Sequence, residues 1–227
     1  NARVHVCDPA SCATTTSTAA DDEQVRHLAI SGATLYWADN SGGTGQKIRK
    51  CTLASCGSTA ADVRTGENNA FGVVLIGGEL YWTIRNGTGK VRHCTAGNCA
   101  APVDLASGSP YANAEGIATD GTNLYWANNN SDTISTCVAT ACAPVTFAPA
   151  SEPHFVLVDQ GRVYWSNGIT STAGSLQWCP ASGCGDAGVH TLAEGQVNPL
   201  WIAADKDAIY WTNSTATGQV MKVRKPQ

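Results

Sequence analysis

The residues with the most distinctive chemistry are ten cysteines, which form five pairs with four residues between the members of each pair. The pairs are Cys7-Cys12, Cys51-Cys56, Cys94-Cys99, Cys137-Cys142 and Cys179-Cys184. A zinc ribbon has two residues between its cysteines and needs a second pair nearby to complete a tetrahedral site. Because these pairs occur singly along the chain, we expect five local disulfides, with no metal and no cofactor. Disulfides persist in oxidising compartments, which indicates a secreted or extracytoplasmic protein, the cell surface included.

A second set of candidate residues precedes the tyrosine of a recurring Tyr-Trp pair by twelve positions. It is polar in every repeat and consists of Gln24, Asn69, Asn113, Glu152 and Asn198. Two positions further on, the residue varies from repeat to repeat: Arg26, Phe71, Glu115, His154 and Leu200. Around a central channel, the polar set would exchange hydrogen bonds with a ligand and the variable set would shape an asymmetric site. The alternative, which we favour for the polar set, is that it satisfies backbone groups in a repeated turn.

Signals for catalysis are few. The chain has neither a Gly-x-Ser-x-Gly elbow nor a His-Glu-x-x-His motif, and its five histidines do not occur at metal-ligand spacings. His27 and His154 fall in equivalent parts of two repeats, and with Glu115 they could transfer protons. Asp120, Asp159 and Asp205 also share one repeat position, where a cation site or a turn would explain them; Asp120-Gly121 favours the turn.

The elements that must position these residues recur with a period of 40 to 45 residues. Successive first cysteines are 44, 43, 43 and 42 residues apart, and each of the four pairs from Cys51-Cys56 onward follows a Tyr-Trp dipeptide. Helical repeats of this length need amphipathic runs, which the sequence lacks, whereas several short strands per unit are typical of β-propeller blades. The sequence therefore predicts an all-β, five-bladed propeller with four-stranded antiparallel blades and a C-x4-C hairpin disulfide in most of them.

Length and charge narrow the partner classes. The chain has 227 residues, 43% of them hydrophobic, and a net charge of −4. It carries no basic stripe for nucleic acid and no apolar run as long as the roughly 18 residues of a membrane span. We expect neither a nucleic-acid partner nor a membrane span.

One domain over residues 1–227 is the expected organisation. Within each repeat we number the strands outward from the axis; the second carries Tyr-Trp, the third ends at the first cysteine and the fourth begins at the second cysteine. The predicted segments are a hairpin at 1–24 that completes the last blade, four blades at 25–67, 68–110, 111–153 and 154–196, and a last blade at 197–227. If the ring closes in this way, the last blade has two candidates for its third strand, one from the N-terminal hairpin and one from residues 220–227, so one strand is in excess. Three explanations stay open: an unusual place for residues 220–227, a longer array, or a hairpin that completes a neighbouring molecule.

The Tyr-Trp strand resembles that of a known family. Ile209-Tyr210-Trp211-Thr212-Asn213 is similar to the Tyr-Trp-Thr-Asp strand of low-density-lipoprotein-receptor type propellers, and Ala118-Thr119-Asp120 and Ala203-Ala204-Asp205 resemble the segment before it. The family's propellers have six blades, its motif aspartate is mostly Asn here, and a disulfide in every repeat is not its hallmark. The resemblance implies an extracellular scaffold that binds a protein or peptide on its top face; the composition suggests a bacterial secreted relative.

The expected function is therefore a secreted, non-catalytic binding or scaffold module with a protein or peptide partner. Its expected site lies on the top face, at the entrance of the central channel. It consists of the polar ring (Gln24, Asn69, Asn113, Glu152 and Asn198) together with Arg26, Glu115 and His154. A first alternative is a glycan-binding propeller, in which Trp178 or Trp201 stacks on a sugar beside Asn side chains. A second alternative is a propeller lyase or hydrolase with its site in the channel.

Overall fold

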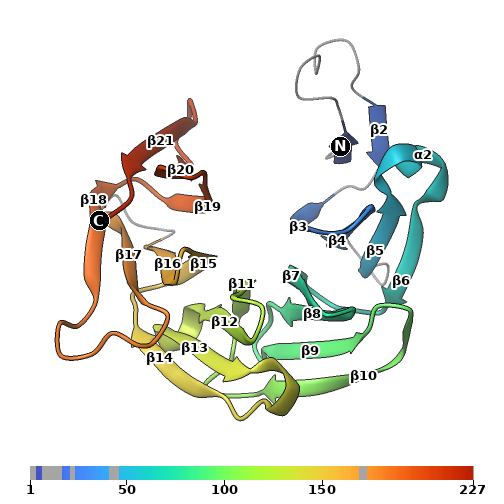
Figure 1. The fold of residues 1–227 in the computed structure, drawn as a ribbon, viewed down its shortest axis with the longest axis horizontal. Helices are drawn as coiled ribbons and strands as arrows, with labels where there is room; N and C mark the ends of the chain where they lie inside the picture. Colours follow the sequence, from blue (N-terminus) through green and yellow to red (C-terminus); the bar gives the residue numbers. More distant parts are fainter. Residues whose placement is uncertain (1–3, 7–16, 21–23, 41–45, 169–172, 227) are drawn as a thin grey trace.

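Five antiparallel sheets surround a central axis in the computed structural model, which describes residues 4–6, 17–20, 24–40, 46–168 and 173–226 (Figure 1). The first two sheets contain β3 (Val25–Ser31), β4 (Thr34–Asp39), β5 (Lys47–Thr52) and β6 (Ala61–Thr65), then β7 (Ala70–Ile76), β8 (Glu79–Ile84), β9 (Lys90–Thr95) and β10 (Asn98–Ser107). The next two contain β11 (Ala114–Thr119), β12 (Asn123–Asn128), β13 (Thr133–Val138) and β14 (Val145–Pro149), then β15 (Pro153–Asp159), β16 (Arg162–Asn167), β17 (Gly174–Pro180) and β18 (His190–Gln196). The fifth contains β19 (Pro199–Ala204), β20 (Ala208–Asn213) and β21 (Gln219–Arg224). The protein is thus an all-β, five-bladed propeller, as predicted.

The Tyr-Trp strands form the core because both of their faces are covered. Trp37, Trp82, Trp126 and Trp165 are completely buried, and the tyrosines beside them are at most 7% exposed. Successive side chains of a strand point to opposite faces, so a run that is apolar at every position needs cover on two sides. Neighbouring blades provide it: Tyr36 and Ile48 of the first blade pack with Leu80 and Trp82 of the second. We call the side of a blade to which its tyrosine points the tyrosine face, and the side to which its tryptophan points the tryptophan face.

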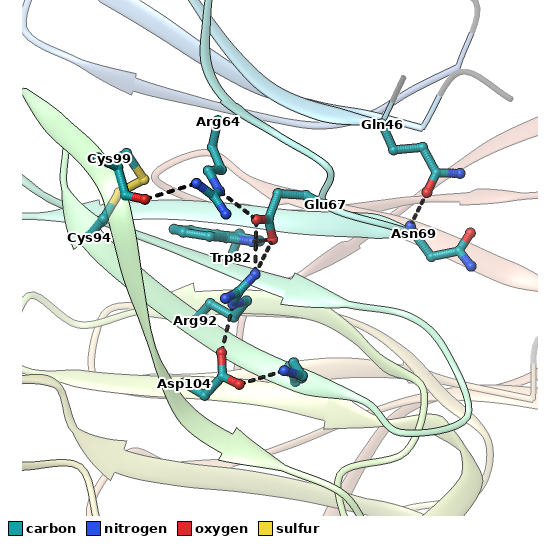
Figure 2. A network of polar contacts seen from close by, with 11 residues as sticks. Gln46, Arg64, Glu67, Asn69, Trp82, Arg92, Cys94, Cys99 and Asp104 are labelled. Carbon is teal, nitrogen blue, oxygen red and sulfur yellow. Dashed lines mark hydrogen bonds and ion pairs between the residues drawn. A yellow bond between two sulfur atoms is a disulfide. The ribbon is translucent and has the colours of Figure 1, made fainter. Parts of the chain in front are cut away.

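A buried carboxylate also links the first two blades. Glu67 is 1% exposed and its carboxylate accepts a hydrogen bond of 2.8 Å from Trp82 Nε1. Arg64 from β6 and Arg92 from β9 approach the same carboxylate at 3.0 and 2.9 Å, and Arg92 also contacts Asp104 on β10 (Figure 2). A buried charge is tolerated when it is paired and hydrogen-bonded. Glu67 therefore serves as an inter-blade link; in the last blade Gln196 accepts the corresponding bond from Trp211 Nε1 at 3.0 Å.

Four of the five predicted disulfides are present: Cys51–Cys56, Cys94–Cys99, Cys137–Cys142 and Cys179–Cys184, with Cα–Cα distances of 4.8 to 5.1 Å. Cys7 and Cys12 lie outside the described residues. The prediction that the fourth strand begins at the second cysteine is wrong for three blades, where this strand starts at Ala61, Val145 and His190. After Cys51 the chain forms a 3-10 turn (Leu53–Ser55) and the short helix α2 (Cys56–Thr59), because the disulfide spans a helical turn there rather than a tight hairpin.

The described strands at the two chain ends belong to separate sheets. β1 (Val4–Val6) pairs with β2 (Ser17–Ala20) in a separate two-stranded sheet, and β19, β20 and β21 form a sheet of three strands. Backbone pairing in the described strands therefore does not join the hairpin to the last blade, and β2 lies against α2 of the first blade. Completion of the last blade by residues 1–24, like the other segment boundaries, stays a prediction.

The repeated aspartates support turns. Asp120 Oδ1 accepts hydrogen bonds from the backbone N–H groups of Thr122 and Asn123 at 2.8 and 2.6 Å, and Asp205 Oδ1 accepts two at 2.8 Å. The other carboxylate oxygen of each residue accepts the hydroxyl of the blade's tyrosine, Tyr125 or Tyr210. These carboxylates thus fix the turn between the first two strands of a blade, and we draw no cation site from them.

Candidate functional site

A repeated irregularity at the start of each innermost strand positions the candidate site. The pairing of the first strand with the second shifts at the same place in all five sheets: between Val25 and Leu28, Ala70 and Val73, Ala114 and Ile117, Pro153 and Val156, and Pro199 and Ile202. A β-bulge bends the strand and re-aims side chains, and bulges are frequent beside active sites. The two residues inside each shift are Arg26-His27, Phe71-Gly72, Glu115-Gly116, His154-Phe155 and Leu200-Trp201. The positions that vary between repeats therefore all lie in a β-bulge that every blade has at the same place.

The residues of the predicted polar ring form the backbone turn that precedes each bulge. Asn69, Asn113, Glu152 and Asn198 have φ angles of 63°, 54°, 46° and 52°. This left-handed conformation favours Asn among non-glycine residues. The carbonyls of these residues and of Gln24 accept a backbone hydrogen bond from the first residue after the Tyr-Trp strand, namely Asn40, Arg85, Asn129, Gly168 and Ser214. The repeated turn thus accounts for the conserved polarity of the ring positions within the chain.

The innermost strands approach closely behind the bulges. A Cβ atom on Gly72 would lie 2.8 Å from the carbonyl oxygen of Glu115, and one on Gly116 would lie 2.7 Å from that of His154. Distances below 3.0 Å between such atoms do not occur in relaxed structures, so glycine is required at both positions. These glycines bring β7, β11 and β15 together and let their neighbours Phe71, Glu115 and His154 meet.

Glu115 is the centre of the resulting cluster. Its side chain is completely buried, its Oε1 lies 2.6 Å from Arg85 Nε, and its Oε2 contacts Nδ1 of His154. Because a carboxylate only accepts hydrogen bonds, this contact requires the form of His154 that carries a proton on Nδ1. A second guanidinium belongs to Arg26, which donates a hydrogen bond to Gln24 Oε1 at 3.3 Å and lies close enough to Arg85 and His154 to interact electrostatically with both.

Burial and the two neighbouring guanidinium groups keep His154 neutral. Burial, and then the positive charges of Arg85 and Arg26, lower the pKa of His154 to about 3. Burial and Arg85 also lower the pKa of Arg26. Two guanidinium groups and one carboxylate leave a net positive charge at the axis. This arrangement can attract an anionic or carbonyl-rich group, while a histidine with such a low pKa is a weak base near neutral pH.

Aromatic rings extend the cluster to the opposite side of the axis. His27 stacks with Trp201 at a centroid distance of 5.9 Å, and Trp201 lies 3.8 Å from Phe155. Phe71 touches His154 edge-on at 5.2 Å, and the guanidinium of Arg85 lies over Phe71. Trp201 remains 38% exposed, so a flat aromatic surface borders the charged cluster.

The structure thus brings together Arg26, Glu115 and His154 of the predicted set, with Gln24 beside Arg26. Asn69, Asn113, Glu152 and Asn198 lie in the turns around them; Glu152 also lines a top-face hollow of about 430 Å³ with Asn167 and Ser175. Sequence reasoning missed Arg85. Its signal was present, because the position after the Tyr-Trp strand holds an uncharged residue in every other repeat: Asn40, Asn129, Gly168 and Ser214. In the described part of the chain, no group of three His, Cys, Asp or Glu side chains is placed to hold a metal ion.

Fold and site together define a disulfide-linked β-propeller with a charged and aromatic cluster at its axis. No protein-family model and no curated protein sequence matches the chain. Among solved structures, a chain in the crystal structure of a nidogen–laminin complex is similar, with 18% identity and a TM-score of 0.75 over 93% of this chain and 80% of that one.

Two other propellers are also similar in structure. A streptogramin B lyase shares 14% identity and a TM-score of 0.65 over 92% of this chain and 71% of its own. A protein assigned as TolB from Agrobacterium tumefaciens shares 12% identity and a TM-score of 0.70 over 92% and 80%. At these identities the similarity establishes the fold.

Proposed function

We propose that this protein is a non-catalytic binding module that recognises a protein or peptide on the top face around the axis. The observation that carries the proposal is the cluster of Arg26, Arg85, Glu115 and His154 beside the exposed ring of Trp201. Each side chain comes from the variable position of a different blade or from the adjoining turn. Buried, well-supported polar groups next to an aromatic anchor are the usual composition of a binding centre.

The partner class follows from charge and from structural similarity. With two guanidinium groups for one carboxylate, we expect the bound segment to present a carboxylate or carbonyl oxygens near Arg85 and Arg26. A structure of similar fold comes from a complex between two proteins, nidogen and laminin, which supports a protein partner here. The four disulfides support an oxidising, extracytoplasmic location for this encounter. No helix in the described residues could cross a membrane.

The test is a comparison of captured partners from the extracellular fraction of the source cells. Immobilised wild-type chain should retain a partner that an Arg26→Ala/Arg85→Ala variant does not retain. Arg162→Ala is the matched control. Arg162 begins the Tyr-Trp strand of its blade, whereas Arg85 follows the end of the corresponding strand. Its guanidinium packs over Trp178, 5.0 Å from the ring centroid. Retention by the double variant, with thermal unfolding unchanged, would remove the axial site from the proposal.

A lyase is a second candidate because Glu115 contacts His154 and a streptogramin B lyase has a similar fold. The low pKa of His154 disfavours it, since proton transfer is most efficient when the pKa lies near the working pH. Incubation with a streptogramin B substrate tests it directly. Turnover that disappears in His154→Gln would establish the lyase and displace the non-catalytic proposal.

Glycan binding is a third candidate, favoured by the exposed face of Trp201 among the top-face asparagines. Sugars that bind there would perturb tryptophan fluorescence, and the effect would be absent in Trp201→Leu. Trp178 is less suited, since His190 stacks on it at 4.4 Å and Arg162 lies over it. A broad glycan array without binding would eliminate this candidate.

A further inference from the structure

Two Asn-Gly dipeptides occur in the chain, Asn86-Gly87 and Asn167-Gly168. Such a dipeptide can react within itself, because the backbone nitrogen of the glycine can attack the side-chain amide carbon of the asparagine and close a five-membered ring. Glycine permits this attack best, since it has no side chain that hinders the nitrogen or restricts the backbone. The structure places the two dipeptides in very different surroundings.

Asn86-Gly87 lies in the turn between β8 and β9, where its reacting atoms are accessible. Gly87 is exposed, and a Cβ atom on it would meet no other group within 4 Å. Among the described residues, none accepts a hydrogen bond from the Gly87 N–H or from Nδ2 of Asn86. The nitrogen that would attack and the nitrogen that would leave are therefore both unengaged within the described part of the chain.

The oxygen of the same side-chain amide is held by hydrogen-bond donors. Oδ1 of Asn86 accepts bonds from Thr88 N at 3.1 Å, Thr88 Oγ1 at 2.8 Å and Gly89 N at 2.9 Å. Attack on the amide carbon moves negative charge onto this oxygen, and preorganised donors stabilise such charge in acyl-transfer reactions. A Cβ on Gly89 would lie 1.7 Å from the carbonyl oxygen of Tyr111, so the turn packs directly against that residue. The donors are thus in place before any reaction.

Asn167-Gly168 is protected at each of these points. Asn167 is 3% exposed and Gly168 is buried. The Gly168 N–H donates to the carbonyl oxygens of Ser151 and Glu152 at 2.9 and 3.2 Å. Nδ2 of Asn167 donates to Oε1 of Gln177 at 2.6 Å. Reaction at this dipeptide would break buried hydrogen bonds, whereas reaction at Asn86 would use existing ones.

We propose that Asn86 is a self-modification site, which converts to aspartate or isoaspartate. The nitrogen of Gly87 gives up its proton and bonds to Cγ of Asn86, while Nδ2 takes up a proton and leaves as ammonia. The product of this step is a succinimide. Water then opens the ring at one of its two carbonyl carbons, which gives aspartate or, when the main chain runs through Cγ, isoaspartate. Water is the co-reactant, and no oxidant or reductant is needed.

The conversion adds a negative charge next to the axial cluster. Asn86 directly follows Arg85 in the chain, and its backbone carbonyl accepts the N–H of Asn113 at 2.9 Å. In isoaspartate this carbonyl becomes part of the free carboxylate and the main chain gains one carbon atom. We therefore expect Arg85 to hold a ligand less well after conversion. This consequence rests on the proposed function, whereas the conversion itself does not.

The experiment follows both asparagines in the same protein. The chain is incubated at neutral and alkaline pH, and conversion is measured by peptide mass spectrometry after digestion at acidic pH. In the folded protein we expect Asn86 to convert about tenfold or more faster than Asn167. In urea, where the surroundings are lost, the two rates should be similar. The rate at Asn86 should rise with pH, because the attacking nitrogen must lose its proton.

Variants of Thr88 test the role of the donors. Thr88 is exposed, so its substitution should leave the fold intact. Thr88→Val removes the hydroxyl donor and should slow the conversion of Asn86 by about threefold or more. Thr88→Ser keeps a hydroxyl and should restore the rate. Conversion of Asn167 is the internal control, because neither variant should change it.

Equal conversion of Asn86 and Asn167 in the folded protein would overturn the proposal. It would also be overturned if Asn86 stays an amide over the time in which the unfolded chain converts. An unchanged rate in Thr88→Val would remove the hydroxyl donor from the mechanism.

The consequence for binding has a test of its own. Converted chain, separated by anion exchange, replaces the immobilised wild-type chain in the capture of partners from the extracellular fraction. Equal capture by converted and unconverted chain would overturn the consequence. An absence of capture by both would contradict the proposed function alone, because the conversion rates do not depend on a partner.

Discussion

The tyrosine face of the third blade and that of the last blade are built from the same repeat positions, yet one is closed and the other open. Ile134 on the third blade is completely buried against the fourth blade, whereas Val220 on the last blade is 77% exposed. The corresponding tryptophan faces differ in the same way. Val73 and Ile117 are at most 1% exposed, but Leu28 of the first blade is 50% exposed. Identical sequence patterns therefore produce a core where a neighbouring blade lies and an apolar surface where none does.

This difference locates the stability of the molecule in contacts between blades. The second and third strands are paired in both blades, because β20 pairs with β21 along its whole length as β12 pairs with β13. What changes is the apolar area removed from water, which contributes about 25 cal/mol per Å². The predictions below set a closed interface against the open one, beginning with the largest expected effect.

Truncation of a tryptophan in a closed interface should have the largest effect. Trp82→Ala removes a completely buried ring and leaves the carboxylate of Glu67 without its indole donor. We expect the free energy of unfolding to fall by about 3–5 kcal/mol. Chemical denaturation measures it, and Trp201→Ala, at a 38% exposed position, is the comparison. An equal loss in the two variants would contradict the assignment of stability to the closed interfaces.

A matched pair of aliphatic truncations tests the same position in both situations. Ile134→Ala should cost about 2–4 kcal/mol, because it opens a cavity between the third and fourth blades. Val220→Ala should change the free energy of unfolding by less than about 0.5 kcal/mol, as expected for an exposed side chain. Denaturant midpoints of the two variants give the comparison. A large loss at Val220 would show that this face is covered in solution, for example by a second copy.

The sequence predicts the closed interfaces well but not the open one. Periodicity and the Tyr-Trp pairs reveal which strands are buried on both faces, because a strand that is apolar at every position has few other stable surroundings. Val220 occupies an equally apolar position, and nothing in its own blade records whether a neighbour covers it. Its exposure depends on the arrangement of the chain ends, which a repeat pattern does not specify.

The candidate site was predictable in part for a related reason. Arg26, Glu115 and His154 were recognisable because they vary at a repeated position, and this contrast is visible in an alignment of the repeats. The bulges that aim them and the ion pair of Glu115 with Arg85 depend on backbone geometry and on distances between strands of different blades. Arg85 could have been found as the charged residue at an otherwise uncharged position.

Disulfides should contribute less than the apolar contacts. Cys137 lies in the closed interface between the second and third blades, and its bridge to Cys142 closes a short loop. Loop entropy predicts a stabilisation of about 2 kcal/mol from such a bridge. Cys137→Ala/Cys142→Ala should lower the unfolding free energy by this amount and keep the far-ultraviolet circular dichroism spectrum. Complete loss of folding in this variant would mean that the bridges, rather than the blade contacts, hold the ring.

An effect smaller than that of a disulfide should arise where the first and last blades meet, at the stacked rings of His27 and Trp201. Burial lowers the pKa of His27 to about 4, and a backbone hydrogen bond with Val73 opposes this only in part. The unfolded chain, with a histidine pKa near 6.5, then binds a proton more readily than the folded one, so stability is complete above about pH 6.5 and declines as the pH falls toward 4. Between pH 7 and 5.5 the loss from this residue should be about 1 kcal/mol.

His27→Gln should reduce the slope of unfolding free energy against pH in this interval, with Trp201 fluorescence as the local signal. An unchanged slope would show that water already reaches His27, and that the first and last blades are separated at the axis as well as at the rim.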